Sequence, residues 1–170
     1  MELNEIKAVY FIGAGGIGMS AIARYFLAKG LVVAGYDKTP TDLTRNLEKE
    51  GMLLHYEENV DEIPHACKNP LNTLVVYTPA IPSTHKELVF FRENNFDIQK
   101  RAQVLGTLTR THKGICVAGT HGKTSTSTMC AHILHQSNVD CNAFLGGISK
   151  DYGNQNVFGY AVKIACDCTI

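Results

Sequence analysis

Apolar residues in the first hundred positions occur in short runs that alternate with amphipathic segments. The run Lys-Ala-Val-Tyr-Phe-Ile at 7–12 ends at a glycine and predicts a strand buried on both faces. Residues 17–29 carry apolar side chains at helical spacing, and a second apolar run follows at 31–36. A strand, a helix and a strand in this order predict two parallel strands joined by a right-handed crossover.

The same alternation continues along the chain. Further strands are predicted at 51–55, 73–77, 96–99, 114–118, 141–144 and 160–166. Further helices are predicted at 41–49, 84–94, 102–111 and 124–136. The polar segment 56–70 is expected to hold at most one short helix, and the two prolines in 78–82 predict a loop. The pattern is typical of the α/β class, with a doubly wound parallel sheet over the first hundred residues.

A glycine-rich turn joins the first predicted strand to the first predicted helix. Its residues are Gly13, Ala14, Gly15, Gly16, Ile17 and Gly18. The spacing G-x-G-x-x-G is typical of loops that bind a nucleotide diphosphate, because the backbone can approach the phosphates and the helix start offers N–H groups. Asp37 closes the second strand, where a carboxylate can accept a hydrogen bond from a ribose hydroxyl. The motif leaves the nucleotide open, and fold analogy alone favours NAD.

A second glycine-rich turn follows the predicted strand 114–118. Its residues are Gly119, Thr120, His121, Gly122, Lys123, Thr124 and Ser125. The turn is shorter than the usual phosphate loop, whose first glycine is replaced here by Val117. It predicts ATP binding, in which Lys123 reaches the β- and γ-phosphates and the Thr124 hydroxyl binds Mg²⁺. A lysine at a helix start is unfavourable without an anion, and this supports a bound phosphate.

Two phosphate-binding turns in one chain predict two domains. We expect a Rossmann-like doubly wound domain at 1–101, a connector at 102–113 and a P-loop-type α/β domain at 114–170. Only 47 residues (170 − 123) follow Lys123, too few for a complete parallel sheet with helices on both faces. The second domain is therefore expected to be truncated, and to be the less stable part of the chain.

Composition narrows the possible classes of protein. The chain has 170 residues, 45% of them hydrophobic and 19% charged, which favours a folded core over disorder. Sixteen basic residues balance sixteen acidic ones, which argues against general attraction to nucleic acid or to an anionic membrane. No apolar run is long enough for membrane insertion, and the N-terminus lacks the pattern of a secretory signal. We expect a cytoplasmic protein whose six cysteines are reduced.

The two turns together resemble those of the Mur ligase family, which makes the cytoplasmic peptidoglycan precursors of bacteria. Segment 117–124 resembles the family's short ATP loop, and segment 12–20 resembles the N-terminal loop of its L-alanine-adding branch. His121 is the form found in that branch, where several later ligases carry asparagine. The resemblance runs from about residue 5 to 150.

Weaker matches extend the resemblance beyond the two turns. They are His55 followed by Asn59 and Val60, the loop Thr-Pro-Ala-Ile from Thr78, and Arg-Ala-Gln from Arg101, where relatives usually have Arg-Ala-Glu. The resemblance implies a UDP-sugar, not NAD, as the ligand of the first turn. The implied UDP-sugar-binding residues are those of the first turn together with Asp37, His55, Thr78 and Arg101.

The implied reaction is ATP-dependent amide formation. The lactyl carboxylate of UDP-N-acetylmuramate is phosphorylated by ATP, and the amine of L-alanine then displaces phosphate. Lys123 and Thr124 would be catalytic, because they stabilise charge on the transferred phosphoryl group and position Mg²⁺. The family has a metal-binding glutamate after the final strand, and Asp167 is the one acid available there in this sequence. The group that binds L-alanine lies outside the chain.

Two other functions stay open at this point. A nicotinamide-dependent oxidoreductase accounts for the first turn and Asp37 but leaves the second turn unexplained. A nucleotide-binding fragment without turnover accounts for both, and we expect no turnover from these 170 residues alone. Of the seven histidines, His55 and His121 are the candidates for a site, and the others are expected to be solvated or to pack. The oligomeric state is not predicted.

Overall fold

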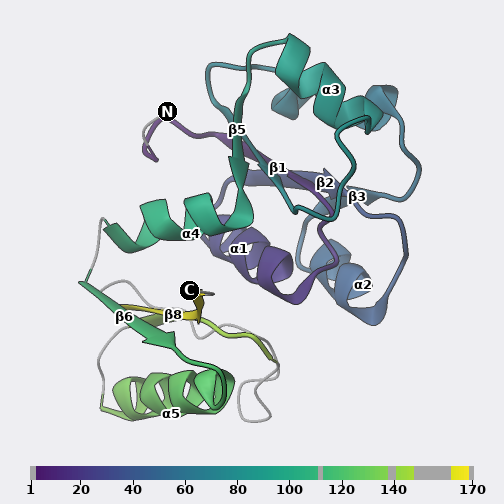
Figure 1. Ribbon diagram of the computed structural model, residues 1–170. Coiled ribbons are helices and arrows are strands. Elements are labelled where there is room, and N and C mark those ends of the chain that lie inside the picture. The colour runs from purple at the N-terminus through teal and green to yellow at the C-terminus, as the bar shows by residue number, and fades with distance from the viewer. Residues whose placement is uncertain (1–2, 111–112, 138–140, 148–161, 169–170) are drawn as a thin grey trace. The chain divides into compact units, whose positions relative to one another are not determined.

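The computed structural model describes residues 3–110, 113–137 and 141–147, together with the backbone of 162–168. The chain divides into two compact units, Met1–Val104 and Leu105–Ile170 (Figure 1). Within the described part of the chain, every predicted helix and strand is present, with ends within two residues of the predicted ones. The predicted alternation of strands and helices is therefore confirmed.

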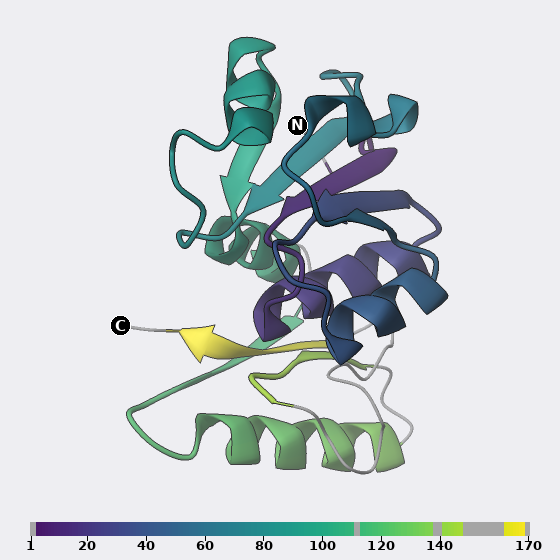
Figure 2. The ribbon, with the colours of Figure 1, turned by 90° about the vertical axis from the view of Figure 1, so that its right-hand side faces the viewer.

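The first unit is built on a five-stranded sheet in which all the strand pairs are parallel, in the order β3-β2-β1-β4-β5. The strands are β1 (Ala8–Ile12), β2 (Val32–Tyr36), β3 (Leu53–His55), β4 (Thr73–Tyr77) and β5 (Asp97–Lys100). The helices are α1 (Ile17–Ala28), α2 (Asp42–Lys49) and α3 (Lys86–Glu93), and α4 (Arg101–Arg110) begins in this unit and crosses the boundary. Figures 1 and 2 show α1 and α2 on one face of the sheet and α3 on the other.

Strand β1 lies at the centre of the core because it pairs with β2 on one side and β4 on the other. All five of its residues are buried, as the uninterrupted apolar run predicts. Ala8, Tyr10 and Ile12 pack on one face against a cluster that includes Leu88 and Phe91 of α3. The core of the first unit thus forms on the strand that leads directly into the glycine-rich turn.

The segment 56–70 differs from the expectation of at most one short helix. It holds two 3₁₀ turns, η1 (Val60–Glu62) and η2 (His65–Cys67). The first begins where the Asn59 side chain accepts a hydrogen bond from the Asp61 N–H, and the second begins directly after Pro64. A polar side chain and a proline at the start of each turn stabilise short pieces of structure that hydrophobic periodicity does not reveal.

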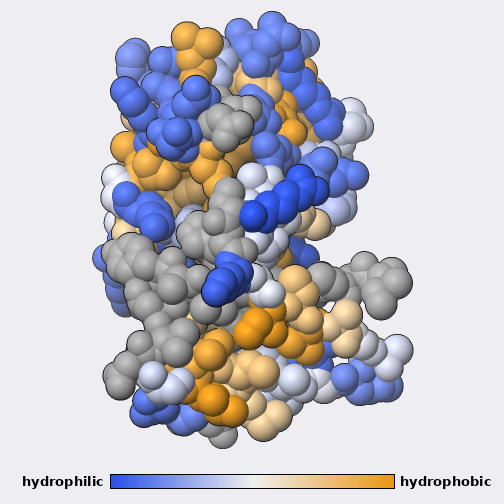
Figure 3. All heavy atoms as spheres, turned by 90° about the vertical axis from the view of Figure 1, so that its left-hand side faces the viewer, coloured by the Kyte–Doolittle hydropathy of each residue, from blue (hydrophilic) through white to orange (hydrophobic). Residues whose placement is uncertain are grey.

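The second unit has a three-stranded parallel sheet in the order β6-β8-β7. Its elements are β6 (Lys113–Ala118), α5 (Lys123–Gln136), β7 (Cys141–Phe144) and β8 (Val162–Cys168). A small buried cluster holds Ala131 of α5 against β7. Apolar side chains also remain at the surface of this unit (Figure 3), among them Ile115, Met129 and Ile133. None of the helices in the described residues combines the length and the apolar character needed to cross a bilayer.

The backbones of β1 and β2 approach each other closely at Gly35. A Cβ atom at Gly35 would overlap the main-chain oxygen of Phe11 in β1, which cannot move without disturbing the sheet. We expect Gly35→Ala to lower the free energy of unfolding by about 1–3 kcal/mol, as overpacking in a core does. Gly106→Ala in α4 is the control, because a Cβ there meets nothing within 4 Å and a helical glycine-to-alanine change stabilises by about 1 kcal/mol. Urea unfolding followed by far-ultraviolet circular dichroism measures both, and equal effects of the two substitutions would contradict this account.

Candidate functional site

The candidate site of the first unit lies at the carboxyl ends of β1 and β4. From β1 the chain builds β2 and β3 on one side of the sheet, and then β4 and β5 on the other. The loops after β1 and β4 therefore leave in opposite directions and open a crevice between them. Ligands of parallel α/β sheets bind at such a switch point.

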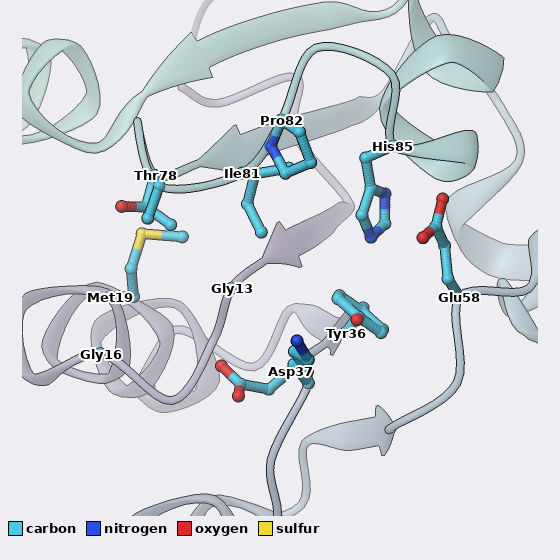
Figure 4. Close-up of a pocket in the computed structure, with 12 residues that line it drawn as sticks. Gly13, Gly16, Met19, Tyr36, Asp37, Glu58, Thr78, Ile81, Pro82 and His85 are labelled. Carbon is cyan, nitrogen blue, oxygen red and sulfur yellow. The ribbon is translucent and has the colours of Figure 1, made fainter.

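A pocket of about 580 Å³ occupies this crevice, a size suited to a nucleotide-like ligand (Figure 4). Its lining comes from the turn after β1, the end of β2, the loop after β4 and the segments that flank η1 and α3. The lining residues are Gly13, Gly16, Met19, Tyr36, Asp37, Lys38, Glu58, Thr78, Ala80, Ile81, Pro82 and His85. The structure thus brings together four of the predicted residues, namely Gly13, Gly16, Asp37 and Thr78.

Two glycines of the first turn are required by close contacts. Gly13 has a φ of 87°, and a Cβ atom there would lie 2.6 Å from Cγ2 of Thr78. Gly15 donates its N–H to Asp37 Oδ2 at 2.6 Å, and a Cβ on Gly15 would lie 2.8 Å from that same oxygen. The other oxygen, Oδ1, accepts from the N–H of Thr39 at 3.1 Å. The Asp37 carboxylate is therefore held by two backbone N–H groups at the edge of the pocket.

The start of α1 supplies the donors for an anion. The N–H groups of Met19 and Ser20 both donate to the Gly16 carbonyl. Those of Ile17 and Gly18 precede the first helical hydrogen bond and are available to a ligand. Among the predicted residues, Ala14 is buried beneath the turn and Ile17 is exposed, and the side chains of neither line the pocket.

Arg101 lies beside the glycine-rich turn but does not line the pocket. It is the first residue of α4, and a Cβ atom on Gly18 would lie 2.5 Å from its Nη1. The absence of a side chain at Gly18 thus allows the guanidinium group to reach the start of α1. A cation at this point can contact an anionic part of a ligand bound to the turn.

His55 belongs to a buried network and is not among the residues that line the pocket. Its Nε2 lies 2.6 Å from Oη of Tyr10, which in turn donates to Oε2 of Glu87 at 2.7 Å. Oε1 of Glu87 accepts from the N–H of Asn59 at 3.2 Å. Burial of Glu87, whose side chain has no exposed surface, raises its pKa to about 7 against the hydrogen bonds from Tyr10 and Asn59. Burial and the neighbouring Glu87 also raise the pKa of Tyr10.

The network has two proton arrangements because Tyr10 has one hydroxyl proton for two partners. When Glu87 is ionised, Tyr10 donates to it and His55 Nε2 donates to Tyr10. Nδ1 of His55 lies 2.8 Å from the Glu57 carbonyl oxygen. When Glu87 is protonated, it can donate to Tyr10, whose own proton is then available to Nε2 of His55. The hydroxyl of Tyr10 thus bridges Glu87 and His55 in either state of Glu87.

The second predicted turn joins β6 to α5, with positive φ angles of 146° at Gly119 and 78° at Gly122. The Lys123 Nζ donates to the carbonyl oxygen of Gly119 at 2.5 Å and lies 3.4 Å from that of Thr120. The side chain of Lys123 therefore folds back over its own loop, where two carbonyl oxygens accept hydrogen bonds from its ammonium group. His121 and Ser125 are exposed and the loop faces solvent, so this strand–turn–helix arrangement agrees with a phosphate-binding loop.

The predicted metal ligands are Thr124 and Asp167. Thr124 lies in the first turn of α5 with its side chain exposed, where a hydroxyl can reach a cation bound to a phosphate. Asp167 lies in β8, whose side chains are outside the described residues. Within the described part of the chain, no group of three or more His, Cys, Asp or Glu side chains could hold a metal ion, and none of the four described cysteines forms a disulfide.

The pocket also contains residues that the sequence did not single out, above all Glu58 and His85. His85 was expected to be solvated or to pack, and it does pack against Tyr36, yet it also lines the pocket. The signal that could have found it is its position directly after the predicted loop 78–82, at the carboxyl end of a central strand.

Comparison with known proteins adds independent evidence. The model of the Mur ligase family, catalytic domain, matches residues 8–113. The chain is 66% identical over 153 residues to a UDP-N-acetylmuramate–L-alanine ligase of Phocaeicola vulgatus. This match covers 90% of the chain and 33% of that protein. It is 64% identical over 152 residues to the ligase of the same name from Parabacteroides distasonis, with 89% and 33% covered. The chain thus spans about a third of the length of these curated relatives.

A solved structure is similar to this chain in both fold and sequence. The crystal structure of a UDP-N-acetylmuramate–alanine ligase from Thermotoga maritima superposes with a TM-score of 0.81 at 31% sequence identity. The match covers 93% of this chain and 36% of the other.

The raised pKa of Glu87 has a consequence for stability. Its folded pKa of about 7 lies above the ordinary 4.5, so its contribution is full below about pH 4.5 and is lost as the pH rises through 7. Glu87→Gln keeps an oxygen for Asn59 and an N–H for Tyr10 but cannot ionise. Between pH 5 and pH 8 the unmodified chain is expected to lose about 2 kcal/mol more of its free energy of unfolding than the variant loses. Urea unfolding at both pH values measures the difference.

The exposed Glu93, on the same helix, provides the matched control for this prediction. Glu93→Gln is expected to leave the difference between pH 5 and pH 8 unchanged. A Glu87→Gln variant with the pH dependence of the unmodified chain would contradict the assignment of that dependence to Glu87.

Proposed function

The chain belongs to the Mur ligase family, and on this premise we propose that it is the N-terminal part of a UDP-N-acetylmuramate–L-alanine ligase. The whole enzyme would join L-alanine to UDP-N-acetylmuramate at the expense of ATP. ATP would transfer its γ-phosphoryl group to the lactyl carboxylate, and the amine of L-alanine would then displace phosphate to form the amide. We propose the bacterial cytoplasm as the place of this reaction, a proposal that the family resemblance supports.

The observation that carries this proposal is the presence of two different phosphate-type turns in one chain. The first opens on a pocket at a switch point and offers backbone N–H groups without a lysine. The second combines two positive-φ glycines with Lys123 and Thr124. A ligase of this kind must hold two phosphorylated molecules at once, the UDP-sugar and ATP, whereas an oxidoreductase leaves the second turn without a role.

We propose that the first turn holds the diphosphate of the UDP-sugar. The N–H groups at Ile17 and Gly18 would receive its oxygens, helped by the positive end of the α1 dipole. The guanidinium group of Arg101, next to Gly18, would compensate the remaining negative charge. Asp37 would accept from a hydroxyl of the ribose, since a carboxylate repels phosphate and favours neutral donors.

The second turn fits ATP and Mg²⁺ in the chemistry of its groups. The Lys123 amine already lies over the loop and would exchange the carbonyl of Gly119 for phosphate oxygens. Thr124 would offer its hydroxyl to the cation, and His121 and Ser125 flank the loop. Bound Mg²⁺ supplies charge neutralisation and orientation of the phosphates. Lys123 and Thr124 thus act by electrostatics and positioning, and the role of Asp167 as a further metal ligand stays a prediction.

We also propose the finer description of the fold: a Rossmann-like doubly wound first domain and the beginning of a P-loop-type α/β domain. Helices on both faces of the first sheet support the former (Figures 1 and 2). For the latter, β6 is mostly exposed, unlike β1, although a parallel strand that leads into a phosphate loop is ordinarily covered on both faces. The exposed Ile115, Met129 and Ile133 offer apolar surface on which further elements of such a domain would pack.

Ligand preference tests the proposed function. We expect the chain to bind UDP-N-acetylmuramate and not NADH. Both carry a diphosphate, but only UDP-N-acetylmuramate adds a sugar carboxylate that the guanidinium group of Arg101 can contact. Calorimetric titration with each compound measures this, and binding of NADH alone would support an oxidoreductase instead. In a phosphate-release assay with ATP, Mg²⁺, UDP-N-acetylmuramate and L-alanine, we expect no turnover from the chain alone.

Substitution of Lys123 separates the two sites. We expect Lys123→Ala to weaken ATP binding about tenfold or more, since a charge-assisted contact to phosphate contributes roughly 1.5–3 kcal/mol. UDP-N-acetylmuramate binding is expected to stay unchanged. Gly13→Ala should have the opposite effect, weakening UDP-N-acetylmuramate binding and leaving ATP binding unchanged, because its Cβ would collide with Thr78 at the first turn. Loss of both ligands with Lys123→Ala, as measured by calorimetry, would contradict the division into two sites.

A further inference from the structure

His85 is a buried polar side chain that lacks a partner. Its exposed fraction is 4%, and neither Nδ1 nor Nε2 has a hydrogen-bond partner within the described residues. Its ring packs on that of Tyr36 at a centroid distance of 4.7 Å and an interplanar angle of 58°. A buried ring nitrogen without a partner is unfavourable. Because His85 lines the pocket, a ligand is the partner that it can acquire.

Glu58 lies next to His85 at the same end of the pocket (Figure 4). Its Oε1 accepts from the backbone N–H of Lys86 at 2.5 Å, which holds the carboxylate at the start of α3. Burial lowers the pKa of His85, against the opposing effect of Glu58, so the ring is neutral and offers one donor and one acceptor. The two residues thus form a fixed pair, in which Glu58 accepts and His85 can donate.

The charges along the pocket orient the proposed UDP-sugar. Arg101 lies by the start of α1, beside Gly18. Glu58 and His85 lie across the pocket from Met19 and Thr78 (Figure 4). The carboxylate of the sugar acid is attracted by the guanidinium group and repelled by Glu58. With the diphosphate at the turn between them, the nucleoside points toward Glu58 and His85.

We propose that His85 and Glu58 recognise the base of the nucleotide through its imide edge. Uracil presents an N3–H donor beside a carbonyl acceptor, O4. Glu58 accepts from N3–H, and a ring N–H of His85 donates to O4. Cytosine has the reverse pattern, with an unprotonated N3 and an amino group, so its N3 would face the Glu58 carboxylate with no proton between them. The inference rests on the proposed UDP-sugar ligand and adds to it the residues that select the base.

Titration with UDP and CDP tests the pair in the 170-residue chain. We expect the unmodified chain to bind UDP about tenfold or more tightly than CDP. His85→Phe keeps the ring against Tyr36 but removes both nitrogens, and it should weaken UDP binding about tenfold or more. His85→Asn, which can still donate, should restore part of the affinity. Glu58→Gln, whose amide can donate to cytosine N3, should bring the two affinities together.

Stability separates recognition from a structural role. Without ligand, His85→Phe should unfold at the same or a higher urea concentration than the unmodified chain, because two unpartnered buried nitrogens are lost. A loss of stability together with a loss of binding would assign His85 to packing and overturn the proposal. His65→Phe, the same change at an exposed histidine of η2, is the control and should alter neither readout.

The outcomes distinguish this inference from the proposed function. Failure of the unmodified chain to bind UDP contradicts the proposed function, and the inference falls with it. UDP binding that His85→Phe leaves unchanged overturns the inference alone, as does a preference for UDP over CDP that survives Glu58→Gln.

Discussion

The first unit depends on strand β1 being paired on both sides, with β2 and with β4. A strand in this position is buried on both faces, and its carboxyl end is the point at which the loops to either side diverge. The chain must turn there within a few residues, with Thr78 and Asp37 already in contact with the turn. Side chains are excluded by these contacts, so the turn is glycine-rich and exposes backbone N–H groups. The pairing of β1 therefore produces both the core and the anion-binding turn.

Buried polar groups in this unit fall into two kinds. The Tyr10–His55–Glu87 network satisfies its own donors and acceptors, and its position between β1, β3 and α3 stabilises the way these elements pack. His85 is also buried, but its ring nitrogens lack partners. Both groups contain a histidine close to Tyr36, with ring centroids 5.7 Å away for His55 and 4.7 Å for His85. Only the histidine without internal partners faces the pocket, and this is the arrangement expected when polarity is kept for a ligand.

The elements and the two turns could be predicted from the sequence because each is delimited locally, by an apolar run, a glycine and a helical period. The roles of the histidines could not. His55 and His85 are 30 positions apart (85 − 55), and which of them meets Glu87 depends on the register of β3 and on the path of the loop after β4. Resemblance singled out His55, whose partners turn out to be internal. Glu58 was missed for the same reason, since its place follows from a hydrogen bond to the start of α3.

The two turns prepare differently for an anion, and this difference bears on how strongly each can bind. At the first turn, the N–H groups of Ile17 and Gly18 precede the first helical hydrogen bond. A phosphate oxygen can accept from them without breaking a hydrogen bond in the protein. At the second, Lys123 already donates to Gly119, so a phosphate replaces an existing bond. The net gain there is smaller, because a lysine satisfied by carbonyls loses them when it turns to the phosphate. Strong ATP binding then requires further contacts to the nucleotide, whereas the first turn and its pocket lie within a single compact unit.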